Sequence, residues 1–174
     1  ELAHGGHLPA LEVPQPKPLP HPAEKAWPVM ETFESEVLDL EWNTLREPPR
    51  EEWISLGRKP GKLCLRGRQP MAAPFAQSML MRRWTSLNFV AETKVNFDPG
   101  HPRQMAGLIC YYDTQDFAYA CITHDGDNSI CLKFIQRVDG QAWHACPQSQ
   151  ESQPLATGEA FLRAQVQNAI LQFA

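Results

Sequence analysis

The clearest pattern along the chain is an alternation of apolar and polar positions from Phe89 to Phe97. The odd-numbered positions point to one face of an extended strand, and the even-numbered ones, which include Glu92 and Lys94, point to the other. Such alternation predicts a strand with one buried and one solvated face. Asp98-Pro99-Gly100 then supplies the turn chemistry that ends the strand.

Three further runs predict strands on either side of short turns. Residues 104–114 (QMAGLICYYDT) are apolar on both faces, which predicts a central strand of a two-layer structure. Residues 117–125 (FAYACITHD) follow as a partner strand. The tetrapeptide 125–128 (DGDN) reads as a hairpin loop before a strand over 129–137 (SICLKFIQR).

The remaining strand signals lie nearer the two ends of the sequence. Residues 53–67 predict a strand, a turn at Pro60-Gly61 and a second strand that ends at Gly67. Residues 160–166 (AFLRAQV) alternate, and a turn at Gln167-Asn168 leads into a final strand. Segment 31–49 favours a short turn or strand over a helix, because prolines flank it. Turns every 8–12 residues without a helical repeat predict an all-β, antiparallel β-sandwich.

Proline divides the chain into two parts. Seven of the 16 prolines fall within residues 1–28, where they exclude a helix or a central strand. We therefore expect residues 1–28 to form a proline-rich, extended connector. Residues 29–174 are expected to form the β-sandwich domain. The alternative for the first part is a disordered tail.

Charge and composition narrow the classes of partner. With 16 basic and 20 acidic residues the net charge is −4, which argues against a nucleic-acid partner, since phosphates need a positive surface. No apolar run approaches the roughly 18 residues of a membrane span, so no membrane partner is expected. The five cysteines are odd in number, and most lie inside apolar runs, which favours a reducing compartment and a cytoplasmic location.

We find no constellation of residues that predicts catalysis by this chain. Nucleophile elbows, zinc-protease motifs and phosphate loops are missing from the sequence. The carboxylate pairs, such as Asp113 with Asp116, fall in predicted turns, where they cap loops rather than face each other across a cleft. The scattered histidines lack a clustered ligand pair, so no metal or cofactor is expected. Residues 125–128 are similar to the start of a calcium loop but lack its closing glutamate, which favours the hairpin.

Four residues are candidates for contact with a carbohydrate or with another domain: Arg83, Trp84, Tyr111 and Tyr112. Tyr111 and Tyr112 are neighbours on one strand, so one must face away from the other, and the outward one is the candidate. Arg83-Trp84 precedes the strongest strand. The alternatives are that the aromatic rings belong to the core, as is common in sandwiches, and that the arginine is a solvated strand end.

Five segments in fixed order carry a family resemblance: WNTLREPP, WISLGRKPGKLCLRG, MLMRRWTSLNFVAETKVNF, QMAGLICYYDTQDFAYACIT and FLRAQVQ. From Phe33 to the end, the chain resembles the C-terminal module of glycoside hydrolase family 43, in its β-xylosidase and α-arabinofuranosidase group. The resemblance implies a concanavalin A-like β-sandwich, or jelly roll. This agrees with the strand pattern.

The resemblance also implies a role and partners. In that family a separate catalytic β-propeller precedes the module, supplies the catalytic carboxylates and binds the xylo- or arabino-oligosaccharide. The module packs on the propeller and closes one side of its pocket, so no catalytic residue is expected in this chain. The family module continues beyond this sequence. We therefore expect a sandwich that is incomplete at its C-terminus and self-associates through unpaired strands. The rival hypothesis is an autonomous, lectin-like carbohydrate-binding module.

Overall fold

The computed structural model describes residues 30–125, 129–143 and 152–174, which contain strands, turns and loops but no helix. Thr32–Ala174 form one compact unit. The connector predicted for residues 1–28 lies outside the described residues, as does most of the 125–128 hairpin loop. The strands are β1 (Asn43–Thr44), β2 (Ile54–Ser55), β3 (Cys64–Leu65), β4 (Leu80–Met81), β5 (Phe89–Asn96), β6 (Ala106–Tyr111), β7 (Phe117–His124), β8 (Ile130–Val138), β9 (Gln141–Trp143), β10 (Gln153–Pro154), β11 (Glu159–Gln167) and β12 (Ile170–Phe173).

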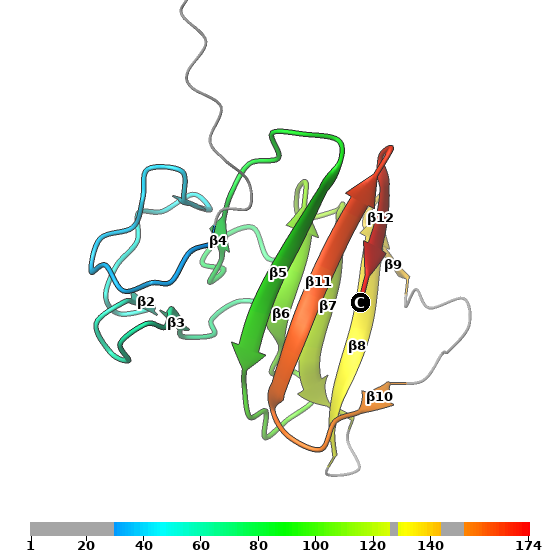
Figure 1. Cartoon of the computed structure of the whole chain (residues 1–174). Helices are drawn as coiled ribbons and strands as arrows, with labels where there is room; N and C mark the ends of the chain where they lie inside the picture. Colours follow the sequence, from blue (N-terminus) through cyan, green and yellow to red (C-terminus); the bar gives the residue numbers. More distant parts are fainter. Residues whose placement is uncertain (1–29, 126–128, 144–151) are drawn as a thin grey trace, which may run out of the picture. The chain divides into compact units, whose positions relative to one another are not determined.

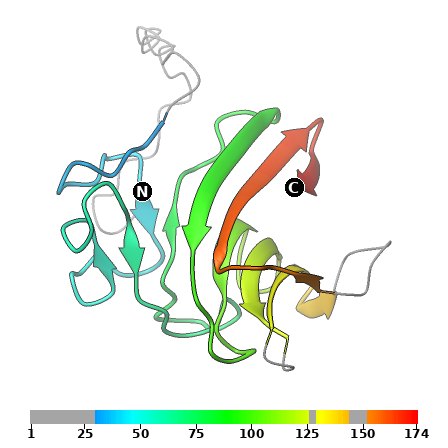
Figure 2. The ribbon, with the colours of Figure 1, turned by 60° about the horizontal axis from the view of Figure 1, so that its bottom comes forward.

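Two larger antiparallel sheets form the layers of a sandwich (Figures 1 and 2). One has the order β10-β8-β7-β6, with β9 also paired to β8, and the other has the order β12-β11-β5. The rings of Phe134 and Phe173 meet between the layers at a centroid distance of 6.0 Å. Two smaller pairs, β1 with β4 and β2 with β3, complete the described strands. The predicted all-β sandwich is confirmed.

Strand β5 lies where the alternation of the sequence predicts it. Its odd-numbered residues are half-buried and its even-numbered residues are exposed. It pairs with β11, whose Leu162, Ala164 and Val166 are almost completely buried. On the solvated face of this pair, Arg163 Nη2 lies 2.5 Å from Glu92 Oε1. The two-residue period therefore sets which face of both strands meets the core.

The centre of the other sheet is β7 rather than the strand that the sequence suggested. Ala120 and Ile122 on one face of β7 are buried, and so are Tyr119, Cys121 and Thr123 on the other face. Strand β6, predicted to be central, has β7 as its one neighbour within the described sheet. Its residues are all half-buried. Apolar residues on both faces of a strand indicate that other layers cover both faces. They do not indicate how many strands pair with its edges.

The hairpins follow the turn signals, with one shift. Strands β2 and β3 pair across the predicted turn, where Gly61 adopts a left-handed φ of 65°. Segment 31–49 forms loops and the short strand β1, as expected. The last hairpin turns at Asn168-Ala169, one residue later than predicted, because Gln167 still pairs with Ile170.

Candidate functional site

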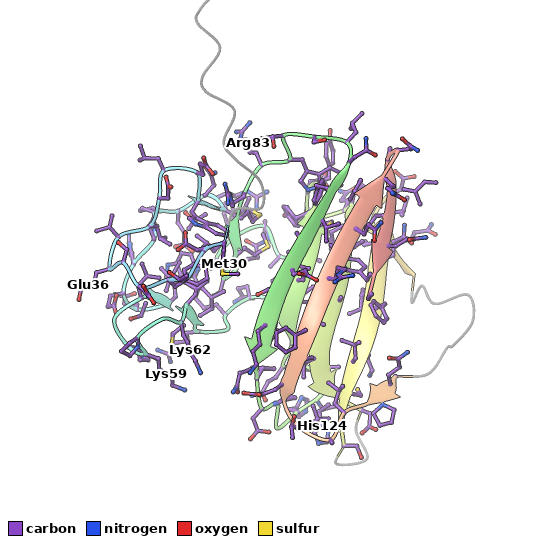
Figure 3. The ribbon with its side chains drawn as sticks, viewed as in Figure 1. Met30, Glu36, Lys59, Lys62, Arg83 and His124 are labelled. Atoms are coloured by element: carbon purple, nitrogen blue, oxygen red, sulfur yellow. The ribbon has the colours of Figure 1, made fainter. Side chains whose placement is uncertain are left out.

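The candidate contact residues lie at one end of the sandwich, which we call the rim. Strand β5 begins there, β6 runs antiparallel to it and ends there, and the β11–β12 turn lies at the same end (Figure 1). Arg83 and Trp84 precede β5, while Tyr111 closes β6 and Tyr112 follows it. The fold therefore brings both predicted pairs to the same end of the molecule, and Figure 3 shows Arg83 at this end.

The two neighbouring tyrosines have opposite environments. Tyr112 is 86% exposed, and its backbone N–H donates to the Asp116 carbonyl at 3.0 Å. Tyr111 is half-buried and its ring stacks on Phe117, with centroids 6.3 Å apart and planes inclined by 21°. The outward member of the pair is therefore Tyr112, and Tyr111 belongs to the packed layer.

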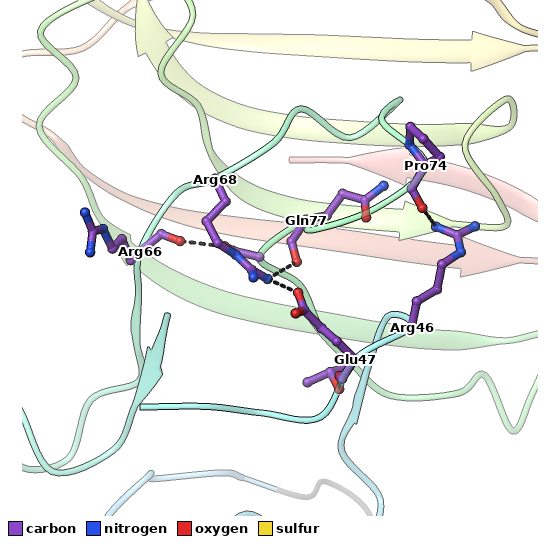
Figure 4. Close-up of polar contacts among 8 residues, drawn as sticks. Arg46, Glu47, Arg66, Arg68, Pro74 and Gln77 are labelled. Carbon is purple, nitrogen blue, oxygen red and sulfur yellow. Dashed lines mark hydrogen bonds and ion pairs between the residues drawn. The ribbon is translucent and has the colours of Figure 1, made fainter. Parts of the chain in front are cut away.

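The hydroxyl of Tyr111 is held near a positive charge. Burial raises the pKa of Tyr111, and the nearby Arg46 guanidinium offsets part of that rise. The hydroxyl oxygen is buried and has no well-formed hydrogen bond among the described residues. Arg46 itself donates to the Pro74 carbonyl at 2.7 Å (Figure 4). Tyr111 is thus a packing residue beside an arginine, not a surface contact.

Arg83 and Trp84 lie on the outside of the rim. Trp84 is 52% exposed, and its ring meets Phe89 edge-on at 4.9 Å, so one part of the ring is fixed and the other faces solvent. Arg83 is exposed and makes no ion pair or hydrogen bond within the described ranges. Its neighbour Arg82 is used internally instead: it pairs with Glu41 and stacks over Trp42 at 5.4 Å.

The loops behind the rim are fixed by carboxylates. Asp113 Oδ1 accepts hydrogen bonds from the backbone of Gln115 at 2.7 Å and of Asp116 at 2.8 Å. Asp116 Oδ1 accepts one from Asp139 N at 3.1 Å, which ties the β6–β7 turn to the β8–β9 turn. The prediction that these two aspartates cap a turn is confirmed. They are occupied in positioning the backbone from which Tyr112 projects.

The structure contains a polar cluster around Arg68 that the sequence pattern did not predict. Arg68 Nη2 lies 2.5 Å from Glu47 and donates to the Gln77 carbonyl at 2.8 Å, and the guanidinium stacks over Trp53 at 4.4 Å (Figure 4). Ser78 Oγ donates to the Arg66 carbonyl at 2.5 Å. These contacts hold together loops with few backbone pairs. The sequence contains no local signal for them, because the partners are 9 to 21 residues apart in the chain.

Glu159, a carboxylate on β11, is not suited to act as the general acid of a glycosidase. The Lys94 ammonium lies 3.1 Å from Glu159 and lowers the pKa of that carboxyl, whereas a general acid needs a raised one. A depression lined by Gln167, Asn168, Ile170 and Gln172 has a volume of about 140 Å³, below the roughly 300–1,000 Å³ of ligand pockets.

Residues 30–125, 129–143 and 152–174 hold no group of three or more potential metal ligands. They contain no helix that could cross a bilayer.

Comparison with known families gives the decisive observation. The model of the β-xylosidase C-terminal concanavalin A-like domain matches residues 30–174. The chain belongs to this family. The fold and the family that the sequence suggested are both confirmed.

Individual relatives show how much of a whole enzyme this family domain represents. The β-xylosidase of Bacillus subtilis is 38% identical over 121 residues, 70% of this chain and 23% of that protein. The xylan 1,3-β-xylosidase of a Vibrio species is 41% identical over 134 residues, 77% of this chain and 25% of that protein. The chain spans about a quarter of the length of these curated relatives.

A solved structure shows the same fold. The xylan β-1,4-xylosidase from Bacillus halodurans C-125 superposes with a TM-score of 0.81 at 34% identity, over 97% of this chain and 32% of that one. The chain is thus a C-terminal domain of the kind found in β-xylosidase-like enzymes of glycoside hydrolase family 43. The relatives are named as glycosidases, and none supports the lectin alternative.

Proposed function

We propose that this domain packs against a catalytic domain of the same polypeptide and forms one wall of its substrate pocket. The observation that carries the proposal is the match to a C-terminal domain that accounts for about a quarter of its relatives. The catalytic part, a β-propeller on the family resemblance, would supply the reacting carboxylates. A rigid wall excludes water from a pocket and limits how substrate can lie in it.

The rim is the surface we propose for contact. Arg83, Trp84 and Tyr112 combine a cation with two exposed rings on fixed backbone. Aromatic rings pack on sugar faces or on apolar protein surface, and an arginine can bind carboxylate groups. Tyr111 is excluded from this role by its packing on Phe117. The proposed substrates are xylosides or arabinosides, hydrolysed by the whole enzyme.

The test uses the Bacillus halodurans relative with its C-terminal domain removed. We expect the present chain to bind this catalytic part and to raise its turnover of a nitrophenyl xyloside, while the chain alone shows none. Tyr112→Ala should reduce the stimulation. Phe161→Ala, an exposed ring of β11 near the end opposite the rim, serves as a control. Turnover by the chain alone that is sensitive to loss of one carboxylate would contradict the proposal. Binding of xylo-oligosaccharides by the chain alone, abolished by Tyr112→Ala, would support the lectin alternative.

We further propose a cytoplasmic location. Cys64, Cys110, Cys121 and Cys131 are all free thiols, which is the usual state of cysteines in a reducing compartment. Imaging of the tagged full-length protein would test this, and export to the medium would contradict it.

A further inference from the structure

The 33–42 loop carries apolar side chains that its own domain does not bury. Leu40 is 98% exposed and Val37 is 77% exposed. Single exposed apolar residues are common on protein surfaces. Here two of them stand three positions apart in one ten-residue loop, so the loop presents a small apolar surface to whatever lies beyond it.

The two ends of this loop are held together. The rings of Phe33 and Trp42 pack with centroids 5.9 Å apart. The Arg82 guanidinium covers Trp42 and its charge pairs with Glu41. Phe33 adopts a φ of 53°, a left-handed conformation that is costly for a bulky residue and persists only where surrounding contacts impose it.

Local hydrogen bonds fix the tip of the loop as well. Ser35 Oγ accepts from Val37 N at 3.1 Å and donates to the Val37 carbonyl at 3.0 Å. Trp42 N donates to the Asp39 carbonyl at 3.0 Å, which closes the turn that holds Leu40. A surface that is already ordered loses little conformational entropy when it binds.

The charge of the loop defines the partner's chemistry. Residues 33–42 contain Glu34, Glu36, Asp39 and Glu41 and no basic residue. Glu41 is paired with Arg82, and Glu36 points away from both sheets in Figure 3. The complementary surface is an apolar socket bordered by lysine or arginine side chains.

We infer that the 33–42 loop anchors this domain in such a socket on the catalytic domain of its own polypeptide. The inference rests on the proposed function and adds, beside the rim, a second surface through which the two domains meet. The family match begins at residue 30, so the loop lies within a few residues of the entry to the domain. About three quarters of each curated relative lies outside the match. The corresponding part of this polypeptide is the partner that we propose for the loop. A covalently joined partner has a high effective concentration at such a nearby surface.

The experiment measures binding of the full chain to the Bacillus halodurans catalytic part at several salt concentrations. The test variant is Val37→Ser with Leu40→Ser, and the control is Phe161→Ser, an apolar residue of β11 that is 76% exposed. We expect the double variant to raise the dissociation constant about tenfold or more, because two aliphatic side chains that would be buried in the socket are lost. The control should change it less than about twofold. A second variant, Glu36→Lys with Asp39→Lys, should slow association and flatten its salt dependence.

The outcomes separate the two proposals. No binding by the unaltered chain contradicts the proposed function itself. Binding that the two loop variants leave unchanged, or that Phe161→Ser weakens equally, contradicts the anchoring role alone. Loss of self-association instead of loss of binding would assign the loop to a contact between copies of this chain. Unchanged thermal unfolding of each variant shows that folding is not responsible.

Discussion

Tyr111 and Tyr112 show at the scale of single residues how a fold assigns roles to equal side chains. Both stand at the end of the same apolar strand, yet the Tyr111 ring stacks on Phe117 and Tyr112 is 86% exposed. The alternation of a strand predicts that they diverge. The alternation does not predict which ring packs against the domain and which faces solvent. That choice depends on Phe117 and Arg46, which other parts of the chain place beside Tyr111.

Substitution of the two tyrosines should therefore have unequal effects on stability. We expect Tyr111→Ala to lower the free energy of unfolding by about 2 kcal/mol or more, since a packed ring is lost. Tyr112→Ala should change it by less than about 0.5 kcal/mol. Urea denaturation of both variants measures the difference. Equal losses would contradict the assignment of Tyr112 to the surface.

The buried thiol of Cys121 predicts a loss of stability at alkaline pH. Burial, and to a lesser degree the neighbouring Cys131, raise the pKa of Cys121 from 9.0 to about 12. Between these values the unfolded chain has released the thiol proton and the folded chain has not. The unfolded state then binds fewer protons, so the free energy of unfolding falls as the pH rises above 9.

Denaturation curves between pH 8 and pH 11 check this expectation. Cys121→Ala should show a shallower decline than the unaltered chain, because one raised pKa is removed, although it will be less stable at pH 8. An identical slope in both proteins would show that Cys121 does not contribute.

At the scale of elements, the close approach of β6 to β7 requires a glycine at position 107. A Cβ atom on Gly107 of β6 would lie 1.9 Å from the Ala120 carbonyl oxygen and 2.7 Å from Cys121 Cα. The glycine therefore permits the β6–β7 pairing. In the sequence it looks like a weak point of an apolar strand.

We expect Gly107→Ala to destabilise the domain by about 3 kcal/mol, through displacement of β6 from β7. Gly57→Ala is the matched control, because no atom lies within 4 Å of its added Cβ. Thermal unfolding compares the two. A melting temperature for Gly107→Ala equal to that of the control would contradict the close approach.

The β11–β12 hairpin carries backbone strain that can be relieved. Asn168 and Ala169 have φ values of 49° and 65°, as required in a two-residue turn with left-handed residues. Alanine pays for this conformation and glycine does not, so Ala169→Gly should raise the free energy of unfolding by about 1 kcal/mol. Ala160→Gly, inside β11, should lower it by a similar amount. If Ala169→Gly also lowered the free energy of unfolding, the strained left-handed conformation at Ala169 would be contradicted.

At the scale of the whole molecule, the sandwich presents open strand edges. Strands β5 and β12 each have one neighbour in their sheet, within the residues described. Open edges can pair with another chain. We propose that the isolated chain self-associates through these edges. The fraction of associated chains should rise with protein concentration.

Light scattering at increasing protein concentration tests the proposal. We expect a rising average mass, and we expect Gln172→Lys, on edge strand β12, to reduce it because edge charge opposes pairing. Gln167→Lys, an exposed position of the interior strand β11, makes the same change of net charge and is the control. A constant monomeric mass at high concentration would contradict self-association.

The sequence by itself determined the all-β class and the positions of β5, β7, β8 and β11, because a two-residue period and turn residues are local signals. The family followed from the resemblance of five segments in fixed order. Tertiary structure alone decided the rest. It placed β7 at the centre of its sheet, chose Tyr112 over Tyr111, gathered the Arg68 cluster and exposed Leu40. Each of these depends on contacts between residues distant in the chain, and no local pattern encodes which distant surface will cover a side chain.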